Sequence, residues 1–356
     1  MQPIAGTNLP PSSPPIPRTD LDDVLQEGAI AWRALAGQRI FITGGTGFFG
    51  RWLLESIDHA NFVAGLGIRA TMLTRNPGEF RRRCPRLAEA AWLSLLVGDI
   101  RRFTSPDTQF DYVIHAAAPV GAQEAPLDMW GTIVEGTRHV LDFAVACKAR
   151  RFLLTSSGAV YGRQPSDILT ISEDYSGAPP SCQIDSVYGE GKRAAEWLCA
   201  AYHRTHGLDC TIARCFAFVG PHLALDAHFA IGNFIRDAML RRPIRIAGDG
   251  TPLRSYLYAS DLIVWLLATL TRGKPLRPYN IGSEHALSIA EIARRVRDLL
   301  AASVPIEFAT QPAPDAKPRP YIPSVARIQL ELGVRQTVDL DTAIRRTAEW
   351  NFPRSS

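Results

Sequence analysis

The sequence lacks the features that mark membrane, secreted and metal-binding proteins. No apolar run reaches the roughly 18 residues of a membrane-spanning helix, and the N-terminus has no charged-then-apolar signal pattern. The six cysteines show no CxxC spacing, and His203 and His206 have no third ligand nearby. We therefore expect a cytoplasmic protein with reduced thiols, no membrane partner and no metal.

A strong charge of either sign is also missing. The chain has 39 basic and 35 acidic residues, and its net charge of +4 is too small to indicate nucleic-acid binding. Its 46% hydrophobic and 21% charged residues are typical of a globular protein. A length of 356 residues allows one large domain or two closely joined ones.

The N-terminal region has two parts. Six prolines within residues 1–18 predict an extended arm, and a helical pattern follows from Thr19 until Gly37 ends it. The apolar face of this helix must cover either the following domain or a second subunit, and the sequence leaves both possibilities open.

Short β-rich runs then alternate with helical patterns. The predicted strands are residues 39–43, 70–74, 93–97, 111–114, 151–155 and 209–214. Helical stretches lie between most of them, notably around 79–91 and 132–148. This rhythm predicts a parallel sheet covered by helices on both faces, with its ligand at the carboxyl ends of the strands.

A glycine turn follows the first predicted strand and precedes a helical pattern. Gly44 permits a tight turn, Gly47 lets the backbone approach a pyrophosphate, and Gly50 lets the helix pack close to the strand. The free N–H groups at the start of that helix favour a phosphate group. This context indicates a Rossmann-type α/β fold, a doubly wound parallel sheet with a smaller, intercalated C-terminal α/β substrate domain.

The expected division places the arm and helix in residues 1–37 and the dinucleotide-binding domain in residues 38–214. Residues 215–356 would form mainly the substrate domain, with some segments returning to the first part. Within this second half we expect a short strand at 255–258 and a proline-rich loop at 311–323.

Two further stretches carry candidate chemistry. Tyr188 and Lys192 are four residues apart at the start of a helical pattern and would share one face, where an ammonium favours a phenolate. Ser156 and Ser157 end the fifth predicted strand, where hydroxyls suit a carbonyl or an alcohol. A solvated helix face for the first pair, and turn hydrogen bonds for the second, are the alternatives.

Taken together, these motifs resemble the extended short-chain dehydrogenase/reductase family, in its nucleotide-sugar epimerase and dehydratase branch. The resemblance runs from about residue 38 to 350. Further motifs that carry it are Gly98-Asp99-Ile100, His115-Ala-Ala-Ala118, Val160-Tyr161-Gly162, Arg214 to Gly220-Pro221 and Gly248-Asp-Gly-Thr-x-x-Arg254.

The resemblance implies NAD or NADP as cofactor and a nucleoside-diphosphate sugar as substrate. It also implies a homodimer formed through a bundle of helices that includes the Tyr188 helix and the one around residues 132–148. It implies that Ser157 binds the C4 oxygen of the sugar, Tyr188 exchanges its proton, and Lys192 binds ribose and stabilises the tyrosinate. The implied substrate ligands are Ser156, Ser157, Asn233 and Arg254. The implied cofactor ligands are Gly44, Thr46, Gly47, Phe48, Phe49, Arg75, Asp99, Ile100, Ala116, Ala117, Ala118, Tyr188 and Lys192.

Departures from the family pattern affect the expected reaction. Members that dehydrate or decarboxylate usually have an acidic residue just after the active-site Ser or Thr, whereas this chain has Gly158 and Ala159. The candidates to substitute for it are Glu124, Asp185 and Glu190.

Two other departures concern the ligands. Ala217 replaces an asparagine that usually contacts the diphosphate. Thr74 stands where a carboxylate usually binds the ribose of NAD, and Arg75 follows it, which favours NADP over NAD.

The sequence therefore predicts a nicotinamide-dependent enzyme acting at C4 of a nucleoside-diphosphate sugar, either a 4-epimerase or a 4-keto reductase. The alternative is a lyase of the 4,6-dehydratase or decarboxylase type with relocated acid and base groups. A cofactor-sensing or scaffold protein without chemistry is a third possibility, which the intact Ser157, Tyr188 and Lys192 disfavour.

Overall fold

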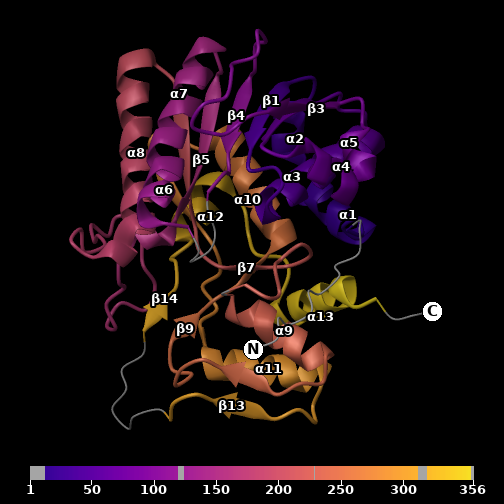
Figure 1. The fold of residues 1–356 in the computed structure, drawn as a ribbon, viewed down its shortest axis with the longest axis vertical. Coiled ribbons are helices and arrows are strands. Elements are labelled where there is room, and N and C mark those ends of the chain that lie inside the picture. The colour runs from indigo at the N-terminus through magenta and orange to yellow at the C-terminus, as the bar shows by residue number, and fades with distance from the viewer. Residues whose placement is uncertain (1–12, 119–123, 228, 312–318, 354–356) are drawn as a thin grey trace.

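The computed structural model describes residues 13–118, 124–227, 229–311 and 319–353 (Figure 1). Its centre is a seven-stranded sheet in the order β11-β6-β5-β4-β1-β2-β3, and every neighbouring pair in it is parallel. The strands are β1 (Arg39–Thr43), β2 (Arg69–Thr74), β3 (Leu93–Val97), β4 (Tyr112–His115), β5 (Arg151–Ser157), β6 (Asp209–Cys215) and β11 (Pro278–Ile281). The predicted doubly wound α/β fold is confirmed.

The order of the strands fixes where a ligand can bind. The chain runs outward from β1 to β3 on one side and from β4 to β6 on the other, so the direction of winding reverses between β1 and β4. In open parallel sheets a crevice forms at the carboxyl ends of the strands at such a reversal. The predicted glycine turn follows β1 and therefore lies at this crevice.

Helices cover both faces of the sheet. The helices α7 (Gly136–Ala146) and α8 (Val187–His206) pack side by side on one face, as Figure 1 shows. The other face is covered by α3 (Phe48–Ala64) and α10 (Ala259–Arg272). All residues of α10 from Ala259 to Leu270 are buried, because this helix is mostly apolar and lies between the sheet and other helices.

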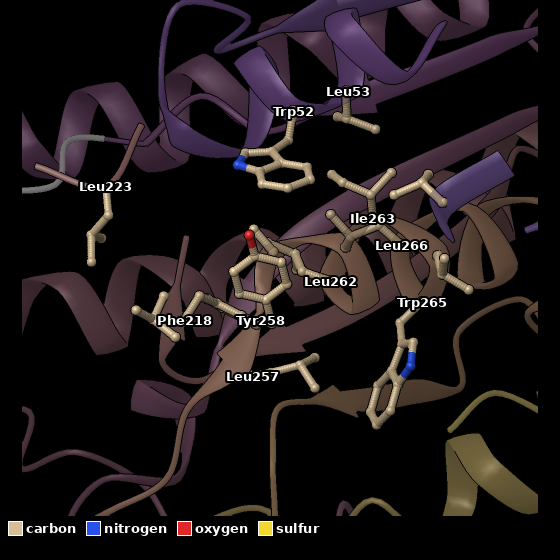
Figure 2. Packing of buried hydrophobic residues seen from close by; sticks show 14 of the residues in the cluster. Trp52, Leu53, Phe218, Leu223, Leu257, Tyr258, Leu262, Ile263, Trp265 and Leu266 are labelled. Atoms are coloured by element: carbon tan, nitrogen blue, oxygen red, sulfur yellow. The ribbon is translucent and has the colours of Figure 1, made fainter. Parts of the chain in front are cut away.

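Large side chains from α3 and α10 fill the space between these helices. Figure 2 shows the Trp52 indole above the ring of Tyr258, with Leu53, Ile263 and Leu266 beside them. The rings of Trp52 and Tyr258 meet edge to face with their centroids 5.9 Å apart, a favourable geometry for aromatic pairs. Tyr258 immediately precedes α10, so the core ties the glycine-turn helix to the second half of the chain.

The N-terminal helix covers its own chain. It consists of two helices, α1 (Arg18–Glu27) and α2 (Ala29–Leu35), and these pack on α3 and α10. The prediction of one continuous helix was wrong, because the chain turns at Gly28, where a side chain would meet the Val24 carbonyl. Within the predicted arm, Ile16 is buried and residues 1–12 lie outside the described part of the chain.

The second half forms a lobe in the lower part of Figure 1 around α9 (Ala230–Met239), α11 (Ile289–Leu300) and α13 (Leu340–Asn351). A three-stranded sheet in the order β12-β9-β14 borders this lobe. Its strands are β9 (Leu253–Arg254), β12 (Leu287–Ser288) and β14 (Pro320–Tyr321). The predicted loop at 311–323 therefore contains a strand, and residues 312–318 lie outside the described residues.

Further corrections concern other helix and strand boundaries. The predicted helix at 79–91 is divided at Pro85, which begins a new short helix. The stretch near 132–148 begins as a π-helix, and the strand expected at 255–258 is shorter. The remaining elements are α4 (Pro77–Arg83), α5 (Pro85–Ala88), α6 (Pro126–Trp130), η1 (Gly131–Glu135), η2 (Gly158–Tyr161), η3 (Ile184–Ser186), β7 (Phe218–Val219), β8 (Ile244–Ile246), β10 (Leu257–Tyr258), β13 (Ile306–Phe308) and α12 (Ala326–Leu332).

Two expectations from composition can be compared with the structure. All six cysteines lie in the described part of the chain, and all are free thiols. Among the described residues, no helix is long and apolar enough to span a membrane, and no group of three or more His, Cys, Asp or Glu side chains is placed to hold a metal ion.

Candidate active site

The glycine turn between β1 and α3 has the shape that its sequence predicts. Gly44 has φ +74°, a conformation that side chains disfavour, and a β-carbon there would lie 2.5 Å from the carbonyl carbon of Ala116. A β-carbon at Gly50 would lie 2.3 Å from the Gly44 oxygen, so α3 packs directly on the turn. Gly47 is exposed at the start of α3, where the free N–H groups face the crevice.

A buried histidine supports the backbone next to this turn. His115 lies at the end of β4 between two threonine hydroxyls, with Nδ1 2.8 Å from Thr43 and Nε2 2.9 Å from Thr137. The Thr137 hydroxyl donates its hydrogen to the Ile133 carbonyl, so it must accept from Nε2–H, and Nδ1 then accepts from Thr43. Burial lowers the pKa of His115 to about 3, so the imidazole ring is neutral and its role is structural.

Ser157 and Tyr188 meet at the carboxyl edge of the sheet. Ser157 ends β5 with 7% of its surface exposed, and its hydroxyl oxygen accepts a hydrogen bond from the Ala159 N–H at 3.1 Å. Tyr188 lies in the first turn of α8, which packs on β5, so its hydroxyl lies near the Ser157 side chain. Burial raises the pKa of Tyr188 to about 12, and the Ser157 hydrogen bond opposes this rise.

Lys192 lies one helical turn after Tyr188, as predicted, but its ammonium group has a different partner. Nζ donates a 2.7 Å hydrogen bond to the Thr155 carbonyl and lies 5.9 Å from the centre of the Tyr188 ring. Burial lowers the pKa of Lys192 to about 8. The sequence predicts that this lysine lowers the pKa of the Tyr188 phenol. In the protein alone, burial has the larger effect and raises that pKa instead.

Ser156 faces away from Ser157 and is part of a structural network. Its hydroxyl donates to Glu196 at 2.5 Å, and the same carboxylate pairs with Arg214 at 2.7 Å. This network ties α8 to β5 and β6. The only hydrogen of Ser156 is committed to Glu196, so its predicted role as a substrate ligand would rest on its oxygen as an acceptor. Ser156 also positions the helix that carries Tyr188.

The predicted adenosine end of the crevice carries two arginines around one carboxylate. Asp99 accepts hydrogen bonds from the Arg101 backbone at 2.9 Å and from its guanidinium at 3.0 Å, and the side-chain bond lowers the pKa of Asp99. Arg75 is exposed just after β2 and also acts on Asp99 electrostatically. Two cationic groups therefore lie at the predicted adenosine end of the crevice.

The other predicted cofactor residues also follow the carboxyl ends of β1, β3 and β4. Thr46 is exposed on the glycine turn, and Phe48 and Phe49 begin α3. Ile100 is buried just after β3, and the residues that follow β4 are half-buried next to the turn, namely Ala116, Ala117 and Ala118. The Ala117 N–H donates to the Thr43 hydroxyl, which joins this segment to β1.

The predicted substrate ligands Asn233 and Arg254 lie on different elements of the second half. The Asn233 amide on α9 donates to the Ala227 carbonyl at 2.8 Å. Arg254 on β9 donates to the Leu253 carbonyl at 2.7 Å, and its guanidinium lies 5.6 Å from the centre of the Tyr321 ring. The positive charge of Arg254 is thus next to a residue that the sequence did not single out.

Tyr321 is the site residue that sequence reasoning missed. Its hydroxyl lies near Ser157, whose side chain opposes the rise that burial causes in the pKa of this phenol, and its ring is 4.8 Å from that of Phe216. A β-carbon on Gly158 would lie 2.8 Å from the Tyr321 hydroxyl and 2.7 Å from the Phe216 ring. Tyr321 lay in a stretch predicted to be a proline-rich loop, where no periodic pattern marked it as part of a site.

The three carboxylates that were candidates for relocated acid and base groups differ in their surroundings. Asp185 is exposed, and Glu190 faces Arg193 at 3.9 Å on the surface of α8. Glu124 is half-buried, and one of its oxygens is buried without a hydrogen-bond partner among the described residues. Glu124 is therefore the strongest of the three candidates.

Comparison with known proteins agrees with this architecture. The sequence pattern of the NAD dependent epimerase/dehydratase family matches residues 40–282, and the chain belongs to this family of nucleotide-sugar enzymes. UDP-glucuronic acid decarboxylase 1 of Arabidopsis thaliana is 31% identical over 319 residues, which cover 86% of this chain and 68% of that protein. UDP-glucuronic acid decarboxylase 3 of the same plant is 32% identical over 310 residues, 85% of each chain.

Solved structures share the fold at lower identity. UDP-glucuronic acid 4-epimerase from Bacillus cereus in complex with NAD superposes with a TM-score of 0.72 and 22% identity, covering 88% of this chain and 96% of that one. The dTDP-glucose 4,6-dehydratase DesIV from Streptomyces venezuelae, solved with NAD bound, gives a TM-score of 0.74 and 24% identity over the same shares.

Proposed function

We propose that the protein catalyses nicotinamide-dependent redox chemistry at C4 of a nucleoside-diphosphate sugar, as a 4-epimerase or a 4-keto reductase. The observation that carries this proposal is the environment of Ser157. The two residues that follow it, Gly158 and Ala159, have no acid or base group, and the rings of Phe216 and Tyr321 occupy the space beside Gly158. The site therefore has a hydroxyl and a phenol for C4 chemistry but lacks the adjacent carboxylate of a lyase.

The residues present fit a nicotinamide cofactor, which would accept or return the C4 hydride when bound. Ser157 orients the C4 oxygen of the sugar, and Tyr188 takes or supplies the proton of that oxygen. Lys192 has two N–H groups besides the one bound to the Thr155 carbonyl, and these can bind a ribose hydroxyl. Arg254 supplies the positive charge for the diphosphate.

The test is incubation of the purified protein with UDP, dTDP, GDP and CDP sugars and their 4-keto derivatives. An epimerase would retain stoichiometric bound cofactor and interconvert C4 epimers without added reductant. A 4-keto reductase would consume added NADPH or NADH in proportion to the 4-keto sugar. The absence of any C4 turnover across this panel, in protein that binds the dinucleotide, would refute the proposal.

We also propose that the cofactor is NADP. Arg75 and Arg101 flank the predicted adenosine site, whereas β2 ends in Thr74, which cannot bind a ribose diol as a carboxylate would. Fluorescence titration with NADPH and NADH measures the preference. An R75A variant should weaken NADPH binding about tenfold and leave NADH binding unchanged. An unchanged NADPH affinity in R75A would exclude this role.

A decarboxylase or dehydratase is the second candidate, favoured by the identity to UDP-glucuronic acid decarboxylases and by the buried oxygen of Glu124, which has no hydrogen-bond partner within the described part of the chain. Mass spectrometry after incubation without reductant would show loss of carbon dioxide from a UDP-uronic acid or loss of water from a UDP- or dTDP-hexose. Such a loss should disappear in E124Q and persist in the exposed control D185N. Activity that persists in E124Q would remove Glu124 as the relocated group.

We propose a homodimer in which α6 and α8 form the contact. Trp197 on α8 and Leu127 on α6 are 69% and 84% exposed, and these two helices pack against each other. Large apolar side chains exposed on adjoining helices are typical of an interface. Light scattering should give twice the chain mass for the wild type and a smaller mass for W197E. A monomeric wild type would overturn this proposal.

We further propose that residues 38–214 bind the dinucleotide and that residues 215–356 bind mainly the substrate. The position of the glycine turn in the first part supports this division, as does that of Arg254 in the second.

A further inference from the structure

Tyr321 reaches the candidate active site because of a strand pairing between distant segments. Tyr321 in β14 pairs with Arg254 in β9, and β9 also pairs with β12. Figure 1 shows β9 and β14 between α8 and the lower lobe. An isolated bridge between Ile171 and Pro323 fixes the chain just after Tyr321. The tyrosine is therefore held by backbone hydrogen bonds on both sides rather than on a free loop.

The Tyr321 ring packs against two groups. The centroid of the Phe216 ring is 4.8 Å from that of the tyrosine ring, and the Arg254 guanidinium is 5.6 Å from the same centre. This packing leaves the side chain little freedom and directs its hydroxyl at the backbone after Ser157. A β-carbon on Gly158 would lie only 2.8 Å from that hydroxyl oxygen, so the close approach requires glycine at this position.

Counting hydrogen bonds at Ser157 shows what this contact does. A serine hydroxyl has one hydrogen to donate and two lone pairs that accept. The Ala159 N–H already donates to the Ser157 oxygen. If the Tyr321 hydroxyl donates to the second lone pair, the only hydrogen of Ser157 must point elsewhere. The hydroxyl of Tyr188 is the other group that interacts with this serine.

We propose that Tyr321 is a positioning residue, which donates a hydrogen bond to Ser157 and thereby aims the Ser157 hydrogen at Tyr188 or at the C4 oxygen of a bound sugar. This inference rests on the proposed C4 redox function. It assigns the two tyrosines different tasks. Tyr188 exchanges the proton, and Tyr321 stays protonated and fixes the direction of the serine between them.

The surroundings of both phenols are consistent with this division. Burial raises the pKa of Tyr321 far above neutrality, and its charged or titratable neighbours are Tyr188, Arg254 and Cys215. Tyr321 is thus protonated near neutral pH and can donate a hydrogen bond. Tyr188 faces Ser157 and Cys215, with Lys192 on the same helix, and a hydrogen bond from Ser157 favours its ionised form.

The test is Y321F, which keeps the ring contacts with Phe216 and Arg254 and removes only the hydroxyl. The titration of Tyr188 is followed in the cofactor-loaded protein by ultraviolet difference absorbance, with the same protein carrying Y188F subtracted. We expect the pKa of Tyr188 to rise by about half to one pH unit, the equivalent of one hydrogen bond. With an active substrate, kcat should fall about threefold to tenfold, with KM changed less than twofold.

The matched control is Y161F. Tyr161 is buried and its hydroxyl donates to Asn280 at 2.8 Å, so loss of this hydroxyl should lower stability and leave the Tyr188 titration in place. A Tyr188 pKa that is the same in Y321F and wild type would overturn the proposal, as would an equal rise in Y161F. Because the titration needs no sugar, failure of the proposed function, seen as no turnover by wild type, stays distinguishable from failure of this inference.

Discussion

Lys192 and Tyr188 lie one turn apart on α8, yet the lysine ammonium donates to the carbonyl of Thr155 on β5 instead of facing the phenol oxygen. The ammonium is almost fully buried, and its distance to the Tyr188 ring centre is 5.9 Å. The lysine therefore ties the helix to the strand that ends in Ser157, and this contact sets the relative position of the phenol and the serine hydroxyl.

The burial of Lys192 makes stability depend on pH. Its pKa is about 8 in the folded protein and 10.5 when unperturbed, so the unfolded chain binds more protons between these values. The free energy of unfolding should therefore rise with pH in this window, by about 2 kcal/mol between pH ~8 and ~10 from this group. Urea unfolding of wild type and K192M measures it, because the variant keeps a long side chain but cannot titrate. Equal pH slopes in the two proteins would contradict the burial of a charged Lys192.

Removal of the Tyr188 hydroxyl should abolish turnover while the cofactor site survives. In Y188F the C4 oxygen loses its proton partner, and we expect turnover to fall about 10²-fold to 10⁴-fold with dinucleotide affinity changed less than about twofold. Steady-state kinetics and fluorescence titration give the two values. Tyr202, on the same helix, donates to Asp142 and serves as the control. Normal turnover in Y202F together with an inactive Y188F would support the assignment of Tyr188 as the group that exchanges the C4 proton. An active Y188F would contradict it.

Two glycines of the same turn should respond differently to a single methyl group. At Gly50 a β-carbon would lie 2.3 Å from the Gly44 oxygen, a backbone atom that cannot give way. G50A should therefore lose about 1–3 kcal/mol of unfolding free energy. At Gly47 the nearest atom is 3.4 Å away and φ is −81°, so G47A should fold normally.

Gly47 nevertheless faces the expected pyrophosphate, and the added methyl group should weaken dinucleotide binding at least about tenfold. Thermal unfolding and cofactor titration of both variants separate the two effects. A G47A protein that binds the dinucleotide as tightly as wild type would show that the backbone approach to phosphate does not occur here.

The N-terminal helix should contribute strongly to stability through Asp20. This carboxylate is fully buried, accepts a 2.6 Å hydrogen bond from Tyr258 and pairs with Arg346. Burial raises the pKa of Asp20 above its ordinary value. In D20N the amide N–H group would face the Tyr258 hydroxyl or the Arg346 guanidinium, which are both hydrogen-bond donors. We therefore expect the free energy of unfolding, measured in urea, to fall by about 1–3 kcal/mol.

The control for this prediction is D23N. Asp23 pairs with the same Arg346 at 3.3 Å, but its side chain is 45% exposed, so its loss should cost less than about 0.5 kcal/mol. Similar losses in the two variants would indicate that the N-terminal helix is held by its apolar face alone.

The sequence by itself determined the elements with a local signal. The strands β1 and β3 have the predicted bounds, and most other strands of the large sheet differ from prediction by one or two residues. Alternation with helices indicated a parallel sheet, and the glycine spacing located the crevice. These features depend on neighbours within about four residues, so periodicity and turn chemistry are sufficient to find them. The four-residue spacing likewise placed Tyr188 and Lys192 on one helix.

Only the tertiary structure decided which side chains meet. Tyr321 reaches Ser157 through a pairing of β14 with β9, and the N-terminal helix proved to cover α3 and α10 of its own chain. The different surroundings of Ser156 and Ser157 also became clear only in the tertiary structure. Successive residues of a strand face opposite sides of the sheet, and the packing of α8 places Glu196 where it accepts the hydrogen bond of Ser156. Contacts between segments far apart along the chain depend on packing and on strand pairing, and neither leaves a periodic trace in the sequence.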